Sequence, residues 1–113
     1  MNYETATNIE LNFELARKLN LRPYKNPEEG GDAVMVTADH GFYKWIDYCT
    51  DWNATMPLAV EHGVYYYPSK NGYEGRVVTK QDRNGHYYNQ KSNEDNPLRA
   101  IVICLIKVLE SKQ

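Results

Sequence analysis

The sequence predicts an α+β domain in which about three helices pack against a small, mainly antiparallel sheet of three to five short strands, with the C-terminal helix central. Three observations support this. Helix-start signals open three segments, short runs rich in β-branched and aromatic residues lie between them, and glycine-containing turns join those runs. The 113 residues, 42% of them hydrophobic, suffice for one core but not for two. We therefore expect residues 1–113 to form a single domain.

The first helix is expected at residues 8–19. Thr7 and Glu10 have the spacing of a capping box, in which each side chain accepts a hydrogen bond from the other residue's amide. Apolar residues at alternate positions from Ile9 to Leu15 would also fit a strand. Good helix formers dominate the segment, however, and they favour the helix.

A loop and a first hairpin are expected next. Residues 21–32 contain two prolines and two glycines, which is typical of a loop. Residues 33–37 and 42–48 are short β-rich runs, and the Asp-His-Gly stretch at 39–41 between them suits a hairpin turn.

A second helix is expected at residues 52–62. Asp51 is a suitable N-cap, and Gly63 is a suitable residue to end the helix. Because proline fits only the start of a helix, Pro57 has to lie in or near the first turn and a half, and the first helical residue stays open.

A second hairpin is expected from the β-rich runs at 64–67 and 73–79. They flank residues 68–72, which end in Asn-Gly, a strong short-range hairpin signal. Residues 80–95 are polar and predict a long loop with room for one further short strand, and loops of that length are often functional or mobile.

The last helix is opened by Asn96 as N-cap and Pro97 at the first helical position, and it is expected to end near Leu109. It is apolar almost all round, which is typical of a helix at the centre of a fold or one covered partly by a second subunit. We favour the central position, and a homodimer stays open. One face of this helix carries Leu98, Ile101, Val102, Leu105, Val108 and Leu109.

Composition excludes several classes of protein. Charged residues make up 25% of the chain with a net charge of −2, unlike the high charge and low hydrophobicity of disordered chains. No apolar run approaches the roughly 20 residues of a membrane-spanning helix, and the N-terminus lacks a signal-peptide pattern, so we expect a cytoplasmic protein without a membrane partner. Cys49 and Cys104 are then expected to be reduced thiols.

Three stretches of the chain resemble the NinX-like family of small proteins from lambdoid phages and prophages. They are NIELN at 8–12, DYCTDWNA at 47–54 followed by Pro57, and NPLRA at 96–100. The resemblance implies a mobile-element protein that acts in the cytoplasm of a bacterial host cell. The family has no assigned activity, so the resemblance implies no catalytic residue.

Signals for catalysis or metal binding are weak. His40, His62 and His86 lie far apart, and no Cys-x-x-Cys or His-x-x-x-His pattern occurs, so we expect no metal and no cofactor. Cys49 precedes a helix start, where a thiolate is stabilised, and His40 or His62 could act as its base, but an ordinary packed thiol is the favoured interpretation. Asp47 and Asp51 could be an acid–base pair, although one of them more simply caps the helix at 52.

The most informative feature is an uneven distribution of charge. Residues 1–64 carry five basic and ten acidic side chains, whereas residues 65–91 carry five basic and two acidic, a net charge of +3. Most of the tyrosines lie in this basic segment. Cations beside aromatic rings suit a protein-binding hot spot or a nucleotide site. The predicted binding site comprises Tyr65, Tyr67, Tyr73, Arg76, Lys80, Arg83, His86, Tyr87 and Tyr88.

Several functions remain open on the sequence. The leading hypothesis is a non-enzymatic phage or prophage accessory protein that binds a host macromolecule, in the first place a host protein, and modulates host metabolism or defence. The alternative is a protein that captures a nucleotide-like small molecule, and a weaker alternative is a small enzyme using Cys49 or a histidine. The basic segment also fits a tyrosine-rich hairpin whose lysines discourage aggregation. The negative net charge argues against binding to duplex DNA.

Overall fold

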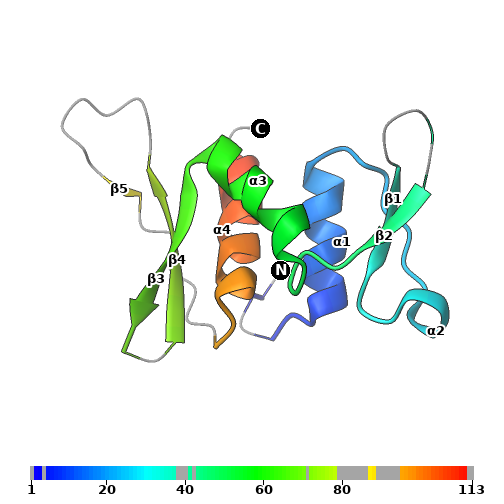
Figure 1. Ribbon diagram of the computed structural model, residues 1–113, viewed down its shortest axis with the longest axis horizontal. Coiled ribbons are helices and arrows are strands. Elements are labelled where there is room, and N and C mark those ends of the chain that lie inside the picture. The colour runs from blue at the N-terminus through cyan, green and yellow to red at the C-terminus, as the bar shows by residue number, and fades with distance from the viewer. Residues whose placement is uncertain are drawn as a thin grey trace.

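The fold places two helices, α1 and α4, side by side between two small antiparallel sheets (Figure 1). The computed structural model describes residues 2–3, 5–37, 41, 43–70, 72–78, 87–88 and 95–111. This arrangement confirms the predicted α+β class. In chain order the elements are α1 (Asn8–Lys18), α2 (Pro27–Gly30), β1 (Val34–Thr37), β2 (Tyr43–Ile46), α3 (Trp52–His62), β3 (Val64–Ser69), β4 (Gly72–Val78), β5 (Tyr87–Tyr88) and α4 (Pro97–Ser111).

The strands divide between two sheets that lie toward opposite ends of the molecule's long axis (Figure 1). The β1–β2 hairpin lies on the side of α1, with Val34 opposite Ile46. The other sheet has the order β3-β4-β5 and lies on the side of α4. The layer formed by α1 and α4 separates the two sheets, so each sheet buries one face on a different helix.

Local signals at the helix ends act as the sequence predicted. Thr7 and Glu10 form the capping box of α1. The Asp51 carboxylate accepts hydrogen bonds from the first-turn amides of α3, and Gly63 ends that helix in the left-handed conformation at φ 68°. Pro57 lies inside α3. The segment at 21–32 also contains α2, a single turn opened by Asn26 and by proline at its start, which the loop prediction did not include.

The second hairpin is tighter than the sequence predicted. Ser69 pairs with Gly72, so only positions 70 and 71 separate β3 from β4. Pro68 lies within β3, where it is tolerated because β3 is an edge strand of its sheet. Of the expected loop at 80–95, the structure describes β5, which pairs with the end of β4, and residue 95. The turn expected at 39–41 lies largely outside the described residues.

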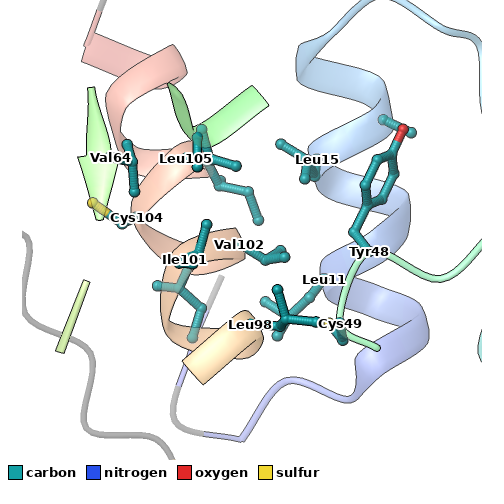
Figure 2. Packing of buried hydrophobic residues seen from close by; sticks show 14 of the residues in the cluster. Leu11, Leu15, Tyr48, Cys49, Val64, Leu98, Ile101, Val102, Cys104 and Leu105 are labelled. Carbon is teal, nitrogen blue, oxygen red and sulfur yellow. The ribbon is translucent and has the colours of Figure 1, made fainter. Parts of the chain in front are cut away.

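The C-terminal helix is central, as predicted. Its residues from Ala100 to Ile106 are all buried, and α4 contacts α1, α3, β3 and β4. Figure 2 shows Leu105 and Val102 of α4 facing Leu15 of α1. Burial on every side explains why this helix is apolar all round.

Close packing against β4 occurs at Gly75. A β-carbon placed there would lie 2.5 Å from the carbonyl oxygen of Ala100 and 2.7 Å from the β-carbon of Cys104. The backbone of α4 therefore lies directly on β4, and any side chain at position 75 would push the helix away. Figure 2 shows Cys104 on the Val64 side of α4 and Cys49 on the other, toward Leu11.

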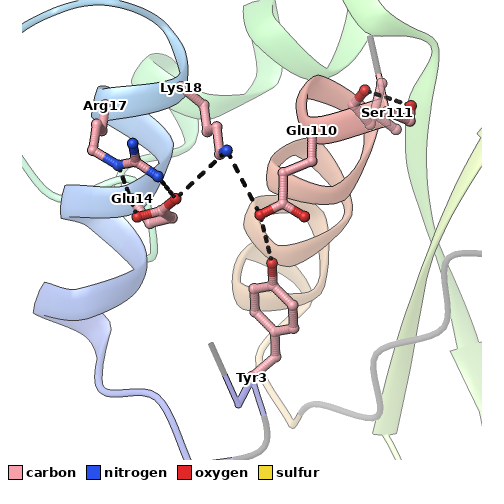
Figure 3. Close-up of polar contacts among 7 residues, drawn as sticks. Tyr3, Glu14, Arg17, Lys18, Glu110 and Ser111 are labelled. Atoms are coloured by element: carbon pink, nitrogen blue, oxygen red, sulfur yellow. Dashed lines mark hydrogen bonds and ion pairs between the residues drawn. The ribbon is translucent and has the colours of Figure 1, made fainter. Parts of the chain in front are cut away.

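Polar contacts among Tyr3, Glu14, Lys18 and Glu110, called the seam below, join the C-terminal ends of α1 and α4 (Figure 3). The Lys18 ammonium lies 3.9 Å from a Glu14 oxygen and 3.8 Å from a Glu110 oxygen, and the Tyr3 hydroxyl donates a 3.2 Å hydrogen bond to Glu110. Partial burial and the nearby negative charge of Glu110 raise the pKa of Tyr3 to about 12. The seam thus ties the N-terminal residues to the last turn of α4.

Over the described ranges, no helix is long and apolar enough to cross a membrane.

Candidate functional site

The β3–β4 hairpin has one face toward α4 and one face away from it. Val64 and Val77 are paired and buried, and Gly75 lies against α4, so these positions define the inner face. Successive residues of a strand point to opposite sides. The outer face, a name used below for four residues only, therefore consists of Tyr65 and Tyr67 of β3 with Glu74 and Arg76 of β4.

The outer face is held together by contacts to one guanidinium group. The Arg76 guanidinium carbon lies 3.9 Å from the centroid of the Tyr67 ring, a cation–π contact. A terminal nitrogen of Arg76 lies 3.2 Å from a Glu74 oxygen. Tyr65 is directly opposite Arg76, and Tyr67 is directly opposite Glu74, so the arginine reaches its tyrosine along the diagonal of the pairing.

Exposure and charge differ among these groups. Tyr67 as a whole residue is 48% exposed, whereas the side chains of Arg76 and Glu74 are 28% and 14% exposed. Desolvation acts to lower the pKa of Arg76, but hydrogen bonds and charge from Glu74 and Tyr65 outweigh it and raise that pKa above its usual value. The arginine is therefore a fixed positive charge on an aromatic surface.

The Nε–H group of Arg76 donates no hydrogen bond within the described residues. Among the buried side-chain atoms of the described residues, Arg76 Nε and Ser69 Oγ have no hydrogen-bond partner. By contrast, Arg17 on α1 donates to Glu14 through both Nε and a terminal nitrogen. A buried donor without an acceptor is costly, so Arg76 is held in a geometry that leaves part of its binding capacity unused.

The structure brings together only part of the site predicted from the sequence. Tyr65, Tyr67 and Arg76 share the outer face. Tyr73 lies on the inner side, where its ring is 5.8 Å from that of Tyr66. Tyr87 and Tyr88 form β5 and pair through their backbones with Val78 and Val77. Three further residues of the prediction, Lys80, Arg83 and His86, lie outside the described residues.

Two contacts were missed by the sequence reasoning. Glu74 was treated only as a charge to be counted, although its pairing position beside Arg76 makes it the partner of that arginine. Trp52, at the start of α3, lies 5.9 Å from Tyr66 and is 44% exposed, so a second aromatic group borders the hairpin on its inner side. Strand alternation would have separated Tyr66 from Tyr65 and Tyr67, but the neighbour from α3 depends on tertiary packing.

The first sheet also exposes aromatic side chains. Tyr43 on β2 is 71% exposed, and the Tyr24 and Trp45 rings pack 6.3 Å apart. Lys44, which follows Tyr43 in the chain, is also exposed. The side chain of Trp45 lies against Gly30, which anchors it to α2. Tyr43 and Lys44 on β2 are thus an exposed aromatic and an exposed cationic residue, the counterparts of Tyr67 and Arg76 on the second sheet.

A buried polar cluster lies at the other side of α4, where α1, the turn before α3 and the start of α4 meet. The fully buried Asn12 amide donates 2.8 Å hydrogen bonds to the Asp47 carboxylate and to the backbone carbonyl of Asp32. The Cys49 amide donates to Asn12 and Asp47 at 3.3 and 3.1 Å. Asn96 donates to the Cys49 carbonyl at 2.9 Å and accepts from the Leu98 amide, which caps α4.

The side chains considered for catalysis in the sequence analysis have structural roles, either in this cluster or as a helix cap. Cys49 is fully buried in the core, and Asp47 accepts the hydrogen bonds of Asn12 and Cys49. Asp51 caps α3, as one of the two aspartates was expected to do. Burial also raises the pKa of the Cys104 thiol to about 12. His40 and His86 fall outside the described residues, and within the described part no group of three or more His, Cys, Asp or Glu side chains could hold a metal ion.

Known proteins offer no further guide to this surface. No protein-family model matches the chain. A search of curated proteins likewise finds no similar sequence.

Proposed function

We propose that this protein is a non-enzymatic binding protein whose outer face docks onto another protein. The observation that carries the proposal is the Arg76 guanidinium, fixed on the ring of the half-exposed Tyr67 and only partly hydrogen-bonded. Tyrosine and arginine are the side chains most enriched at the energetic centres of protein interfaces. A guanidinium that is already in place loses little side-chain entropy when a partner binds.

A protein partner is favoured over a nucleotide-like ligand by two contacts. Glu74 neutralises much of the charge that a phosphate would need, because it is bonded to the same guanidinium. Arg76 also covers one face of the Tyr67 ring, which a stacking base would have to share. A mixed surface of aromatic, cationic and anionic groups suits a protein interface. Capture of a nucleotide-like small molecule remains the second candidate, supported by the same tyrosines beside Arg76.

The proposal that binding rather than catalysis is the function draws support from the groups that catalysis would need. Cys49 has no exposed surface, and Asp47 and Asp51 accept structural hydrogen bonds. A small enzyme that used Cys49 would need this thiol to reach solvent. A Cys49→Ser change is therefore expected to affect stability and not partner binding.

The biological setting is proposed from the resemblance to NinX-like phage and prophage proteins. This resemblance supports the proposal of a mobile-element accessory protein in the cytoplasm of a bacterial host. Its partner there is a host protein, and binding alters host metabolism or defence. A homodimer would present two outer faces and is compatible with this role.

Affinity capture from a bacterial lysate with matched variants tests the proposed surface. Arg76→Glu and Tyr67→Ala should each reduce recovery of a stoichiometric partner roughly tenfold or more, because they remove an interface hot spot. The controls Lys44→Glu and Tyr43→Ala make the same types of change on exposed residues of β2 and should leave recovery unchanged. Native mass spectrometry of the eluate identifies the partner and the oligomeric state.

Two results would contradict the proposal. Recovery that survives both outer-face variants, or that falls equally with the β2 controls, places the interface elsewhere. A small bound mass in place of a protein, together with thermal stabilisation by nucleotides that is lost in Tyr67→Ala, would establish the ligand-capturing alternative.

A further inference from the structure

The ion pair between Arg76 and Glu74 differs from the other close arginine–glutamate pair among the described residues, Arg17 with Glu14. Arg17 and Glu14 form a two-bond fork, in which Nε and a terminal nitrogen each reach an oxygen. Arg76 bonds Glu74 through a terminal nitrogen alone, at 3.2 Å, and its Nε has no partner within the described part of the chain. A one-bond pair is weaker than a fork, so a second carboxylate can replace Glu74 more easily than it could replace Glu14.

The outer face carries one cationic and one anionic side chain, Arg76 and Glu74, which are bonded to each other. The sequence segment 65–91, to which these residues belong, has a net charge of +3. A carboxylate brought by a partner would meet Arg76 beside the half-exposed Tyr67, with Tyr65 directly opposite the arginine on β3. Tyr67 holds the guanidinium plane in place. Arg76 Nε is buried in the free protein, so the incoming carboxylate reaches it only after Glu74 has moved away.

We propose that the outer face is a receptor for a carboxylate of the partner protein, an Asp or Glu side chain that takes the place of Glu74 on Arg76. This inference rests on the proposed function and names the chemistry of the partner. Glu74 then acts as an internal competitor that keeps the arginine occupied in the absence of the partner. The incoming carboxylate completes the fork by accepting from Nε as well as from a terminal nitrogen, as Glu14 does at Arg17.

Arginine side-chain nuclear magnetic resonance tests this directly, with a hexaglutamate peptide as the probe. The Nε–H signal of Arg76 should move on titration, because this group gains an acceptor. The Nε–H signal of Arg17 is the internal control and should stay in place, because Glu14 already occupies it. Removing the competitor by Glu74→Gln should tighten binding of the peptide about two- to fivefold, the range expected for loss of one weak ion pair. Arg76→Lys keeps the charge without the fork and should weaken binding.

Three outcomes overturn the inference. The first is an Arg76 Nε–H signal that does not move, and the second is a Glu74→Gln variant that binds hexaglutamate no more tightly. The third is a response to inorganic phosphate or adenosine monophosphate as strong as the response to the peptide, which would make the site a phosphate receptor. If lysate capture still depends on Tyr67 and Arg76 in any of these cases, the proposed function stands and only the partner chemistry is wrong. If capture ignores both residues, the proposed function itself fails.

Discussion

Two polar regions, the buried polar cluster and the outer face, lie on opposite sides of α4 and differ in how fully their hydrogen-bonding groups are used. In the buried polar cluster, the Asn12 amide makes three hydrogen bonds, two as a donor and one as an acceptor. On the outer face, Arg76 keeps a buried Nε without a partner. Saturated polar groups in a core specify one packing, whereas a partly satisfied group at a surface can gain a bond when something binds. We therefore propose that the polar residues of the cluster serve the fold and that those of the outer face serve recognition.

The cluster joins three stretches that are far apart in the sequence, at 8–12, 47–54 and 96–100. Asn12 belongs to the first of these stretches, Asp47 and Cys49 to the second, and Asn96 to the third. Arg99 of the third stretch donates to Asn8 and to the Ala6 carbonyl. These stretches therefore converge on contacts that join α1, the turn before α3 and α4, and none of them contributes to the outer face.

The largest effect is expected from Asn12→Asp, which is nearly isosteric. The new carboxylate loses the two donated bonds and faces Asp47, so the free energy of unfolding should fall by about 3 kcal/mol or more. Asn53→Asp, at an exposed position in the first turn of α3, is the matched control and should be neutral or slightly stabilising. Urea unfolding at pH 7 measures both. Equal stability of the two variants would show that the cluster does not hold the fold together.

Two neighbouring residues of β4 allow the same comparison within one strand, because Gly75 packs against α4 and Glu74 lies on the outer face. Gly75→Ala places a β-carbon against the backbone of α4, so the free energy of unfolding should fall by about 1–3 kcal/mol. The neighbouring Glu74→Ala, on the outer face, breaks the ion pair with Arg76 and should lower it by at most about 1 kcal/mol. A Gly75→Ala variant as stable as the parent protein would contradict the packing of α4 on β4.

The α1–α4 seam has a pH dependence of known sign. The folded-state pKa of Tyr3 is raised to about 12 from 10, so its contribution is complete below pH 10 and is lost as the pH rises toward 12. Tyr3→Phe should lower the free energy of unfolding at pH 8 by at most about 1 kcal/mol and make its decrease between pH 10 and 12 less steep. Tyr48 and Cys104, whose pKa values are also about 12, should keep some alkaline destabilisation in the variant. Parallel unfolding curves for the two proteins across this range would refute the role of Tyr3.

The effect on stability that we expect at Arg76 itself is also small. Arg76→Gln loses one partly buried ion pair and one cation–π contact, so the free energy of unfolding should fall by about 1 kcal/mol. Partner recovery should nevertheless fall, which separates the two regions by function. Denaturant unfolding measured beside affinity capture checks this, and a large loss of stability would assign Arg76 to the fold.

The sequence predicts what short-range signals control. Thr7 with Glu10, Asp51, and Asn96 with Pro97 each act on amides within a few residues, and these helix starts match the structure. Long-range contacts could not be predicted in this way. Asn12 bonds partners 20, 35 and 37 residues away, and no local pattern identifies them.

The candidate site was predictable in part for the same reason. Composition located the basic, tyrosine-rich segment, and strand alternation separates Tyr65 and Tyr67 from Tyr66. The diagonal contact between Tyr67 and Arg76 depends on the pairing register, which begins at Ser69 opposite Gly72 and not where the Asn-Gly signal suggested. A shift of one residue would have placed Arg76 on the other face.

Hydrogen–deuterium exchange on the captured complex is the most direct test of the central claim. The account predicts that the backbone amides of β3 and β4 gain protection when the partner is bound, while those of β1 and β2 exchange as in the free protein. Protection confined to β1 and β2, or absent from residues 64–78, would contradict a docking function of the outer face.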